Sequence, residues 1–212
     1  MLRAVTDQEF AELLALQHEL PAVEFKPDGA RGDKTLFHSV AKAILGMANR
    51  RDGGRIVLGV REDQPGKLER VGLTEAQAAT WRHDELAAAI APVADPYVTF
   101  EVEEHRYEDT LYLVVDVREF EEVPVICRRD YPPNLKAGQK AMLRAGAVYV
   151  RTRRIPETTE IPSQTEMREL IELATEKRMR SLLGTIDRAG LEVRPKAAPD
   201  EQFLAELPED LR

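Results

Sequence analysis

Three glutamates stand where they could support chemistry on a phosphodiester. Glu19 and Glu24 flank the entry to a short alternating segment, AVEFK, and Glu62 lies just past the apolar run RIVLGV. If these two segments are neighbouring strands, their ends gather the three carboxylates in one cleft. Carboxylates that close repel one another unless a divalent cation lies among them. The pattern therefore predicts a site at which Mg²⁺ or Mn²⁺ activates water and neutralises the transition state.

Lys26 is the fourth candidate catalytic residue. It lies two positions after Glu24, so on a strand both side chains point to the same face. There its ammonium could stabilise developing negative charge. The ordinary alternative is that the glutamates, which belong to a set of 38 acidic residues, are solvated or paired with Arg or Lys. Spacing alone leaves both interpretations open.

A basic cluster follows later in the chain. Residues 121–155 carry a net charge of +5, although the whole chain carries −8. Phosphate is attracted by the local field rather than by the total charge. The cluster predicts a track for a nucleic-acid backbone, and Tyr131 within it is a candidate for stacking on a base. Its members are Arg128, Arg129, Lys136, Lys140, Arg144, Arg151, Arg153 and Arg154.

The elements that must position these residues follow from local patterns. Thr6 with Glu9 and Thr74 with Gln77 form capping boxes, and each predicts a helix start. Apolar spacing of three and four predicts a helix over 34–49, and Ser163 with Glu166 begins a last one. Residues 61–73 are predicted to be a polar loop. Strands are predicted for AVEFK, RIVLGV, Tyr97–Glu103, Thr110–Val117, Val123–Ile126, and a pair at Ala141–Arg144 and Ala147–Arg151.

This order predicts an α/β (α+β) fold with a single mixed β-sheet flanked by helices. We expect one domain over 1–192 and a loosely held, acidic and proline-rich tail over 193–212. The sequence contains neither an apolar run of about 20 residues, as a membrane helix requires, nor a signal peptide. The one cysteine, Cys127, cannot form an internal disulfide and is expected to be buried. We therefore expect a cytoplasmic protein that does not enter a membrane.

Three stretches together resemble the Schlafen-type AlbA-like domain: ELPAVEFK, VAKAILGMANRRDGGRIVLGV and RAGAVYVRTRR. The resemblance covers residues 19–151 and implies a mixed α/β core that binds nucleic acid. In Schlafen members that cleave transfer RNA, an acidic triad acts with a divalent metal. That triad falls on Glu19, Glu24 and Glu62, the last replacing the Asp of vertebrate members. The family also pairs two related lobes into a basic valley, which a chain with one lobe could build as a homodimer.

The leading hypothesis is a nucleic-acid-binding domain for structured RNA such as transfer RNA, with RNA favoured over DNA. Metal-dependent endoribonuclease activity is its extension, and Mg²⁺ or Mn²⁺ is the implied cofactor. A second hypothesis is a non-catalytic protein-interaction or regulatory module that uses the last helix and the acidic tail. A third, ATP binding, is disfavoured because no P-loop lysine follows Gly53, Gly54 and Gly59.

Overall fold

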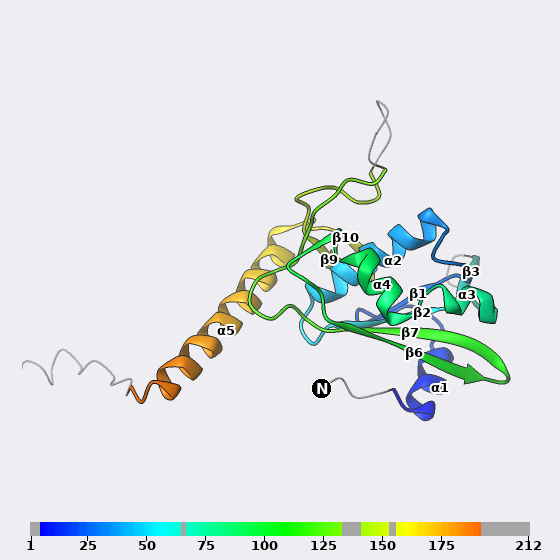
Figure 1. The fold of residues 1–212 in the computed structure, drawn as a ribbon, viewed down its shortest axis with the longest axis horizontal. Coiled ribbons are helices and arrows are strands. Elements are labelled where there is room, and N and C mark those ends of the chain that lie inside the picture. Colours follow the sequence, from blue (N-terminus) through cyan, green and yellow to red (C-terminus); the bar gives the residue numbers. More distant parts are fainter. Residues whose placement is uncertain (1–4, 65–66, 133–140, 153–155, 192–212) are drawn as a thin grey trace, which may run out of the picture. The chain divides into compact units, whose positions relative to one another are not determined.

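The computed structural model describes residues 5–64, 67–132, 141–152 and 156–191 (Figure 1). The chain forms two compact units, residues 1–174 and 175–212. The sheets and the first four helices belong to the first unit. The predicted boundary between residues 192 and 193 stays a prediction, because the tail lies outside the described residues. Of the helices in the described part of the chain, none is long and apolar enough to cross a bilayer.

A four-stranded mixed sheet lies at the centre of the first unit. It consists of β1 (Val23–Lys26), β2 (Gly54–Leu58), β7 (Thr110–Val117) and β6 (Phe100–Tyr107), in that spatial order. β1 pairs with β2 in parallel, and β7 pairs antiparallel with both β2 and β6. The predicted fold class is confirmed. The AVEFK and RIVLGV segments are neighbouring strands, as the predicted site requires. The predicted strands Tyr97–Glu103 and Thr110–Val117 correspond to β6 and β7, which form an antiparallel hairpin.

Alternation along the strands divides the core between the two faces of this sheet. Ile56 and Leu58 pack in the same hydrophobic cluster as the buried face of α2 (Lys34–Ala48). Val57, between them, packs in a second cluster with the apolar side chains of α1 (Asp7–Ala15). Successive strand side chains point to opposite faces. Both faces of β2 are therefore covered, as its continuous apolar sequence predicts.

The remaining elements surround this core. The predicted capping boxes of Thr6 with Glu9 and of Thr74 with Gln77 are both present. The predicted strand Val123–Ile126 is reduced to a two-residue strand, Ile126–Cys127, which pairs with Ala94–Asp95. The other elements are β3 (Val60–Gln64), β4 (Lys67–Arg70), α3 (Glu75–Ala79), α4 (His83–Ile90), β5 (Ala94–Asp95), β8 (Ile126–Cys127), β9 (Tyr149–Arg151), β10 (Thr158–Glu160) and α5 (Gln164–Arg188).

The prediction of a loop over 61–73 is wrong, because β3 and β4 form an antiparallel hairpin there. Gly59 separates β2 from β3 at a φ of +102°, a conformation that residues with a side chain rarely adopt. A Cβ at Gly59 would also lie 2.9 Å from the Cα of Gly72. The hairpin is missed in the sequence because most of its described side chains are exposed. No apolar alternation therefore marks it as a strand pair.

The predicted pairing of Ala141–Arg144 with Ala147–Arg151 is also wrong. β9 pairs antiparallel with β10 instead. Residues 142–147 lie against residues 127–131: the Tyr131 N–H donates to the Leu143 carbonyl (2.8 Å), and the Cys127 N–H donates to the Ala147 carbonyl (2.8 Å). The turn at Gly146 returns the chain toward Cys127, whose carbonyl accepts from the Gly146 N–H (2.7 Å). The two predicted strands therefore pair with other segments of the chain and not with each other.

Candidate functional site

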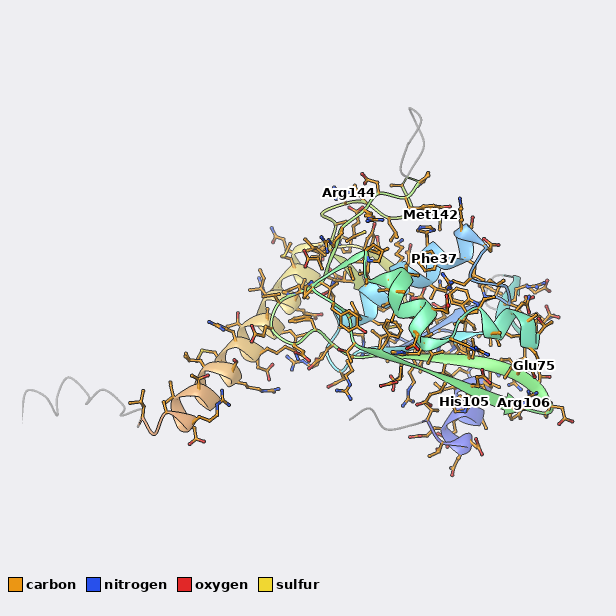
Figure 2. The ribbon with its side chains drawn as sticks, viewed as in Figure 1. Phe37, Glu75, His105, Arg106, Met142 and Arg144 are labelled. Atoms are coloured by element: carbon orange, nitrogen blue, oxygen red, sulfur yellow. The ribbon has the colours of Figure 1, made fainter. Side chains whose placement is uncertain are left out.

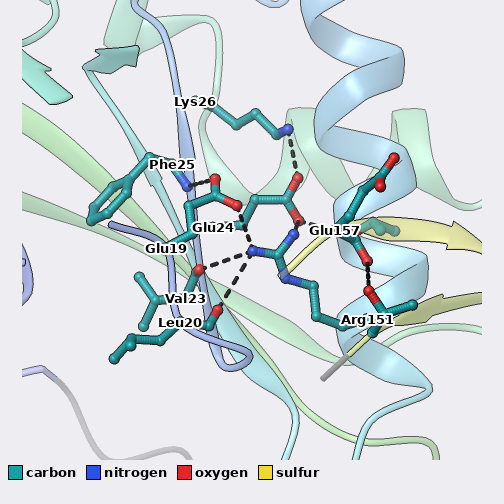
Figure 3. Close-up of polar contacts among 10 residues, drawn as sticks. Glu19, Leu20, Val23, Glu24, Phe25, Lys26, Arg151 and Glu157 are labelled. Atoms are coloured by element: carbon teal, nitrogen blue, oxygen red, sulfur yellow. Dashed lines mark hydrogen bonds and ion pairs between the residues drawn. The ribbon is translucent and has the colours of Figure 1, made fainter. Parts of the chain in front are cut away.

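Glu24 and Lys26 share one face of β1, as predicted (Figure 3). Val23 and Phe25 alternate with them and pack in the cluster on the α1 face of the sheet. Lys26 Nζ lies 2.6 Å from Glu24 Oε1, and the Glu24 side chain is only 7% exposed. Lys26 and Glu24 therefore form a nearly buried ion pair on β1.

Glu19 precedes β1 and reaches the same place through its side chain. Its Oε1 accepts from the backbone N–H of Phe25 (2.9 Å), which anchors the carboxylate beside the strand. Its other oxygen, Oε2, lies 2.6 Å from Arg151 Nη2. The predicted approach of Glu19 to Glu24 thus exists, but a guanidinium lies between the two acids.

Arg151, from β9, bridges both carboxylates (Figure 3). Its Nη1 lies 3.1 Å from Glu24 Oε2, and its side chain is 1% exposed. Nη2 also donates to the Val23 carbonyl (3.2 Å). The buried Nε has no hydrogen-bond partner among the described residues. The arginine therefore contacts the acids through its two terminal nitrogens.

Thr158, from β10, completes the contacts of Glu24. Its hydroxyl donates to Glu24 Oε2 (2.8 Å), and the residue is buried. β10 can lie this close to α2 because Gly46 has no side chain: a Cβ there would lie 2.5 Å from Thr158 Cγ2. The β9–β10 pair therefore places both Arg151 and Thr158 over the acids of β1.

A cavity of about 750 Å³ adjoins this network. Glu62, on the exposed β3 strand, lines it together with Glu19, Glu24 and Lys26. The structure thus places all four predicted catalytic residues on the wall of one cavity. Other charged groups on that wall include Lys42, Arg61, Arg151 and Glu157.

This arrangement does not fit a divalent cation between Glu19 and Glu24. The position between the two carboxylates is bridged by Arg151, and the second oxygen of Glu24 is paired with Lys26. Across the described ranges, no three His, Cys, Asp or Glu side chains are grouped so as to hold a metal ion. The metal site at Glu19, Glu24 and Glu62, and with it the Mg²⁺ or Mn²⁺ cofactor, stays a prediction.

The predicted basic track divides in the structure. Arg128, Arg129 and Arg144 are exposed, and they lie on the two segments joined by the backbone hydrogen bonds between residues 127–131 and 142–147. We call these three residues the basic ledge. Arg151, by contrast, is buried against the acids. Four predicted members lie outside the described residues: Lys136, Lys140, Arg153 and Arg154.

Arg144 of the basic ledge already has a carboxylate partner. Its Nε lies 3.0 Å from Glu160 Oε1, and its Nη2 lies 2.6 Å from Oε2, a two-pronged contact. The hydrogen bonds from Arg144 lower the pKa of Glu160 below its usual value. Both side chains remain well exposed, at 58% and 42%. Figure 2 shows Arg144 on the segment that also carries Met142.

An aromatic stack borders the basic ledge. The rings of Tyr131 and His38 lie parallel, with centroids 3.2 Å apart and planes 9° apart. His38 belongs to α2, and burial lowers the pKa of its ring, which favours the neutral form. The sequence singled out Tyr131 but not His38. Neither Thr158 nor the pairing role of Arg151 could be predicted from the sequence, because no local pattern links these residues to β1.

Comparison with known proteins assigns the family. The chain is similar to a solved N-terminal domain of a putative ATP-dependent DNA helicase RecG-related protein from Nitrosomonas europaea, at 25% identity and a TM-score of 0.44. The match covers 68% of this chain and 91% of that domain. It is also similar to the DIP2311 protein of Corynebacterium diphtheriae, at 18% identity and a TM-score of 0.42. That match covers 66% of this chain but only 22% of the DIP2311 chain. No curated protein matches the chain. The family model described as Schlafen, AlbA_2 matches residues 19–157, most of the first unit, and the chain therefore belongs to the Schlafen AlbA_2 family.

Proposed function

We propose that this chain binds nucleic acid through the basic ledge. Membership in the Schlafen AlbA_2 family supports a nucleic-acid-related function. The observation that carries the proposal is the exposure of Arg128, Arg129 and Arg144 on two hydrogen-bonded segments. Arginine presents its donors in a planar fork that matches phosphate oxygens. Three such side chains on adjoining backbone form a surface that a sugar–phosphate chain can follow.

The contact between Arg144 and Glu160 does not oppose this proposal. An exposed pair of this kind is worth about 0–1 kcal/mol. A phosphate that offers Arg144 an equivalent two-pronged contact can therefore replace the carboxylate at small cost. Glu160 would then return to solvent, since it is itself well exposed.

RNA with unpaired bases is the nucleic acid that we propose. Tyr131 lies two positions after Arg129 and stacks on His38 of α2, and both residues are partly exposed. Unpaired bases stack on such rings, whereas bases within a duplex are not accessible for stacking. Structured RNA with loops, such as transfer RNA, offers both the phosphates and the free bases.

Binding is tested by fluorescence anisotropy with a labelled hairpin RNA and the DNA hairpin of the same sequence. Arg128→Gln with Arg129→Gln should weaken RNA binding and flatten its salt dependence. The logarithmic slope should change by about 0.7 to 0.9 for each phosphate that the protein no longer neutralises. Arg144→Gln should act in the same direction. Equal binding by all variants, or a binding constant independent of salt, contradicts the proposal.

Arg106 provides a matched control for Arg144. Its side chain is also 58% exposed and is also paired with a glutamate, Glu75. In Figure 2, Arg106 and Glu75 lie far from Arg144. Arg106→Gln therefore removes the same charge from the same kind of contact but should leave RNA binding unchanged.

Metal-dependent cleavage is a separate prediction, tested by incubation of transfer RNA with Mg²⁺ or Mn²⁺. The geometry favours binding without cleavage, because Arg151 and Lys26 already neutralise Glu19 and Glu24. Products that form with the original protein and disappear with Glu24→Gln would establish the endoribonuclease. Products that persist with Glu24→Gln would come from another source.

A protein-interaction role through α5 is the second candidate. Met179, Leu182 and Leu183 on this helix are each about half exposed. Residues 164–176 carry four acidic side chains and one basic, and residues 177–188 carry four basic and one acidic. A second copy of the helix in antiparallel orientation would place opposite charges beside each other. We therefore propose a homodimer formed by α5.

Light scattering after size-exclusion chromatography tests this dimer. Leu182→Glu with Leu183→Glu should yield a monomer, and higher salt should weaken the original dimer by screening the charges. Loss of the dimer with RNA binding retained would separate the two roles. A protein that is monomeric at every concentration before substitution contradicts the dimer.

A further inference from the structure

Arg151 holds the position that a metal ion would take in a carboxylate site. Its two terminal nitrogens contact Glu19 Oε2 at 2.6 Å and Glu24 Oε2 at 3.1 Å. Lys26 Nζ contacts the remaining oxygen of Glu24 at 2.6 Å. Two carboxylates thus face one guanidinium and one ammonium, so the formal charges of the network balance.

Burial makes this balance necessary. The side chains of Arg151 and Glu24 are 1% and 7% exposed, so water cannot screen either charge. Buried carboxylates require a partner of opposite charge. A guanidinium remains protonated at any pH a protein tolerates, whereas lysine and histidine can lose their protons. Arg151 therefore supplies a permanent positive charge.

A divalent cation and this guanidinium exclude each other. The cation would have to displace Arg151 from both acids and would then lie a few ångströms from a buried like charge. The guanidinium is also fixed in place, because its Nη2 is held by the Val23 carbonyl as well as by Glu19. Direct coordination by Glu19 and Glu24 is therefore possible only once the arginine is gone.

We infer that Arg151 is the resident cation of the Glu19–Glu24 pair, and that its replacement by a neutral side chain turns the pair into a divalent-cation site. The carboxylate cluster of this chain then organises the wall of the cavity rather than recruiting a metal. This inference does not depend on RNA binding by the basic ledge.

The experiment measures Mn²⁺ uptake by electron paramagnetic resonance and thermal unfolding with and without MnCl₂. The original protein should take up no Mn²⁺ at this site, and its melting temperature should not depend on the metal. Without metal, Arg151→Met should melt at a lower temperature than the original protein. Mn²⁺ should bind Arg151→Met at least about tenfold more tightly than it binds the original protein, and should raise the melting temperature of the variant. Arg151→Lys keeps a positive charge beside the acids, so it should gain no tight Mn²⁺ binding, although it should melt at a lower temperature because one ammonium cannot replace both guanidinium contacts.

Two further variants make the result specific. Adding Glu24→Gln to Arg151→Met should abolish the Mn²⁺ uptake that the single variant gained. Arg144→Met also frees a glutamate from an arginine, but only one and at the surface, so it should gain no tight Mn²⁺ binding. A folded Arg151→Met protein that takes up no more Mn²⁺ than the original protein overturns the inference.

The original protein provides an independent measurement if Arg151→Met does not fold. Stoichiometric uptake of Mn²⁺ by the original protein, abolished in Glu24→Gln, would show that the arginine does not exclude the metal and would overturn the inference. Absence of such uptake supports it. Failure of RNA binding in the anisotropy experiment would leave both results unaffected.

Discussion

The side-chain amide of Asn49 pairs with the backbone of Val125 in both directions. Its Nδ2 donates to the Val125 carbonyl (2.8 Å), and its Oδ1 accepts from the Val125 N–H (2.7 Å). Nδ2 also donates to the carbonyl of Tyr149 on β9 (2.9 Å). One buried side chain at the end of α2 therefore satisfies backbone groups of two segments, including the strand that carries Arg151.

Asn49→Ala should lower the free energy of unfolding by about 1–3 kcal/mol, because it leaves the buried N–H of Val125 and two carbonyls without their partner. Urea denaturation at pH 7 measures the change. Asn49→Asp keeps the acceptor but loses both donations, so it should also destabilise the protein. Full stability of the alanine variant would show that other groups replace these bonds.

Gly59→Ala should also destabilise the protein. At a φ of +102°, the added Cβ would lie 2.9 Å from both the Gly72 Cα and the Tyr112 ring. We expect a loss of about 1–3 kcal/mol from strain and crowding. Gly32→Ala is the matched control, because a Cβ there meets nothing within 4 Å and Gly32 has no positive φ. Equal melting temperatures for the two variants would count against this explanation.

Asp116 on β7 should reduce stability at neutral pH. Burial raises its pKa above the usual 3.8, and the partner Arg55 lies 3.9 Å away and only partly offsets this. As the pH rises through 3.8, the unfolded chain releases this proton before the folded chain does. Stability is therefore lost across the interval between 3.8 and the raised pKa of the folded state, and the loss is complete above it.

Asp116→Asn should accordingly be more stable than the original protein at pH 7, and the difference should vanish below about pH 3.8. Thermal unfolding across this pH range measures it. Asp84→Asn is the control, because the Asp84 carboxylate is fully exposed. It should leave the melting temperature unchanged both at pH 7 and below about pH 3.8. A stabilisation by Asp116→Asn that persists unchanged at low pH would not arise from this carboxyl group.

Cys127 should react slowly with alkylating reagents while the protein is folded. The thiol is buried, as the sequence predicted, and burial raises its pKa. Less thiolate and less access both reduce the rate. Mass spectrometry after treatment with iodoacetamide at pH 7 should show little modification of the native protein and complete modification in urea. Rapid alkylation of the native protein would indicate local opening of the segment around β8.

Elements that depend on nearby residues could be predicted from the sequence alone. The capping boxes at Thr6 and Thr74, the α2 helix and the apolar β2 strand each follow from side chains within a few positions of one another. The shared face of Glu24 and Lys26 follows from the period of a strand. For the same reason, the family could be identified from short motifs spread over residues 19–151.

Which charged side chains pair with one another depends on how the whole domain folds. Arg151 lies 132 positions after Glu19, and it reaches that carboxylate because β9 pairs with β10 and not with residues 141–144. That choice depends on contacts such as the close approach of Thr158 to Gly46. Local patterns specify which face a side chain occupies, but partners far apart in the chain are selected by packing of the whole domain. A predicted phosphate-binding arginine thus became the buried partner of the predicted metal ligands.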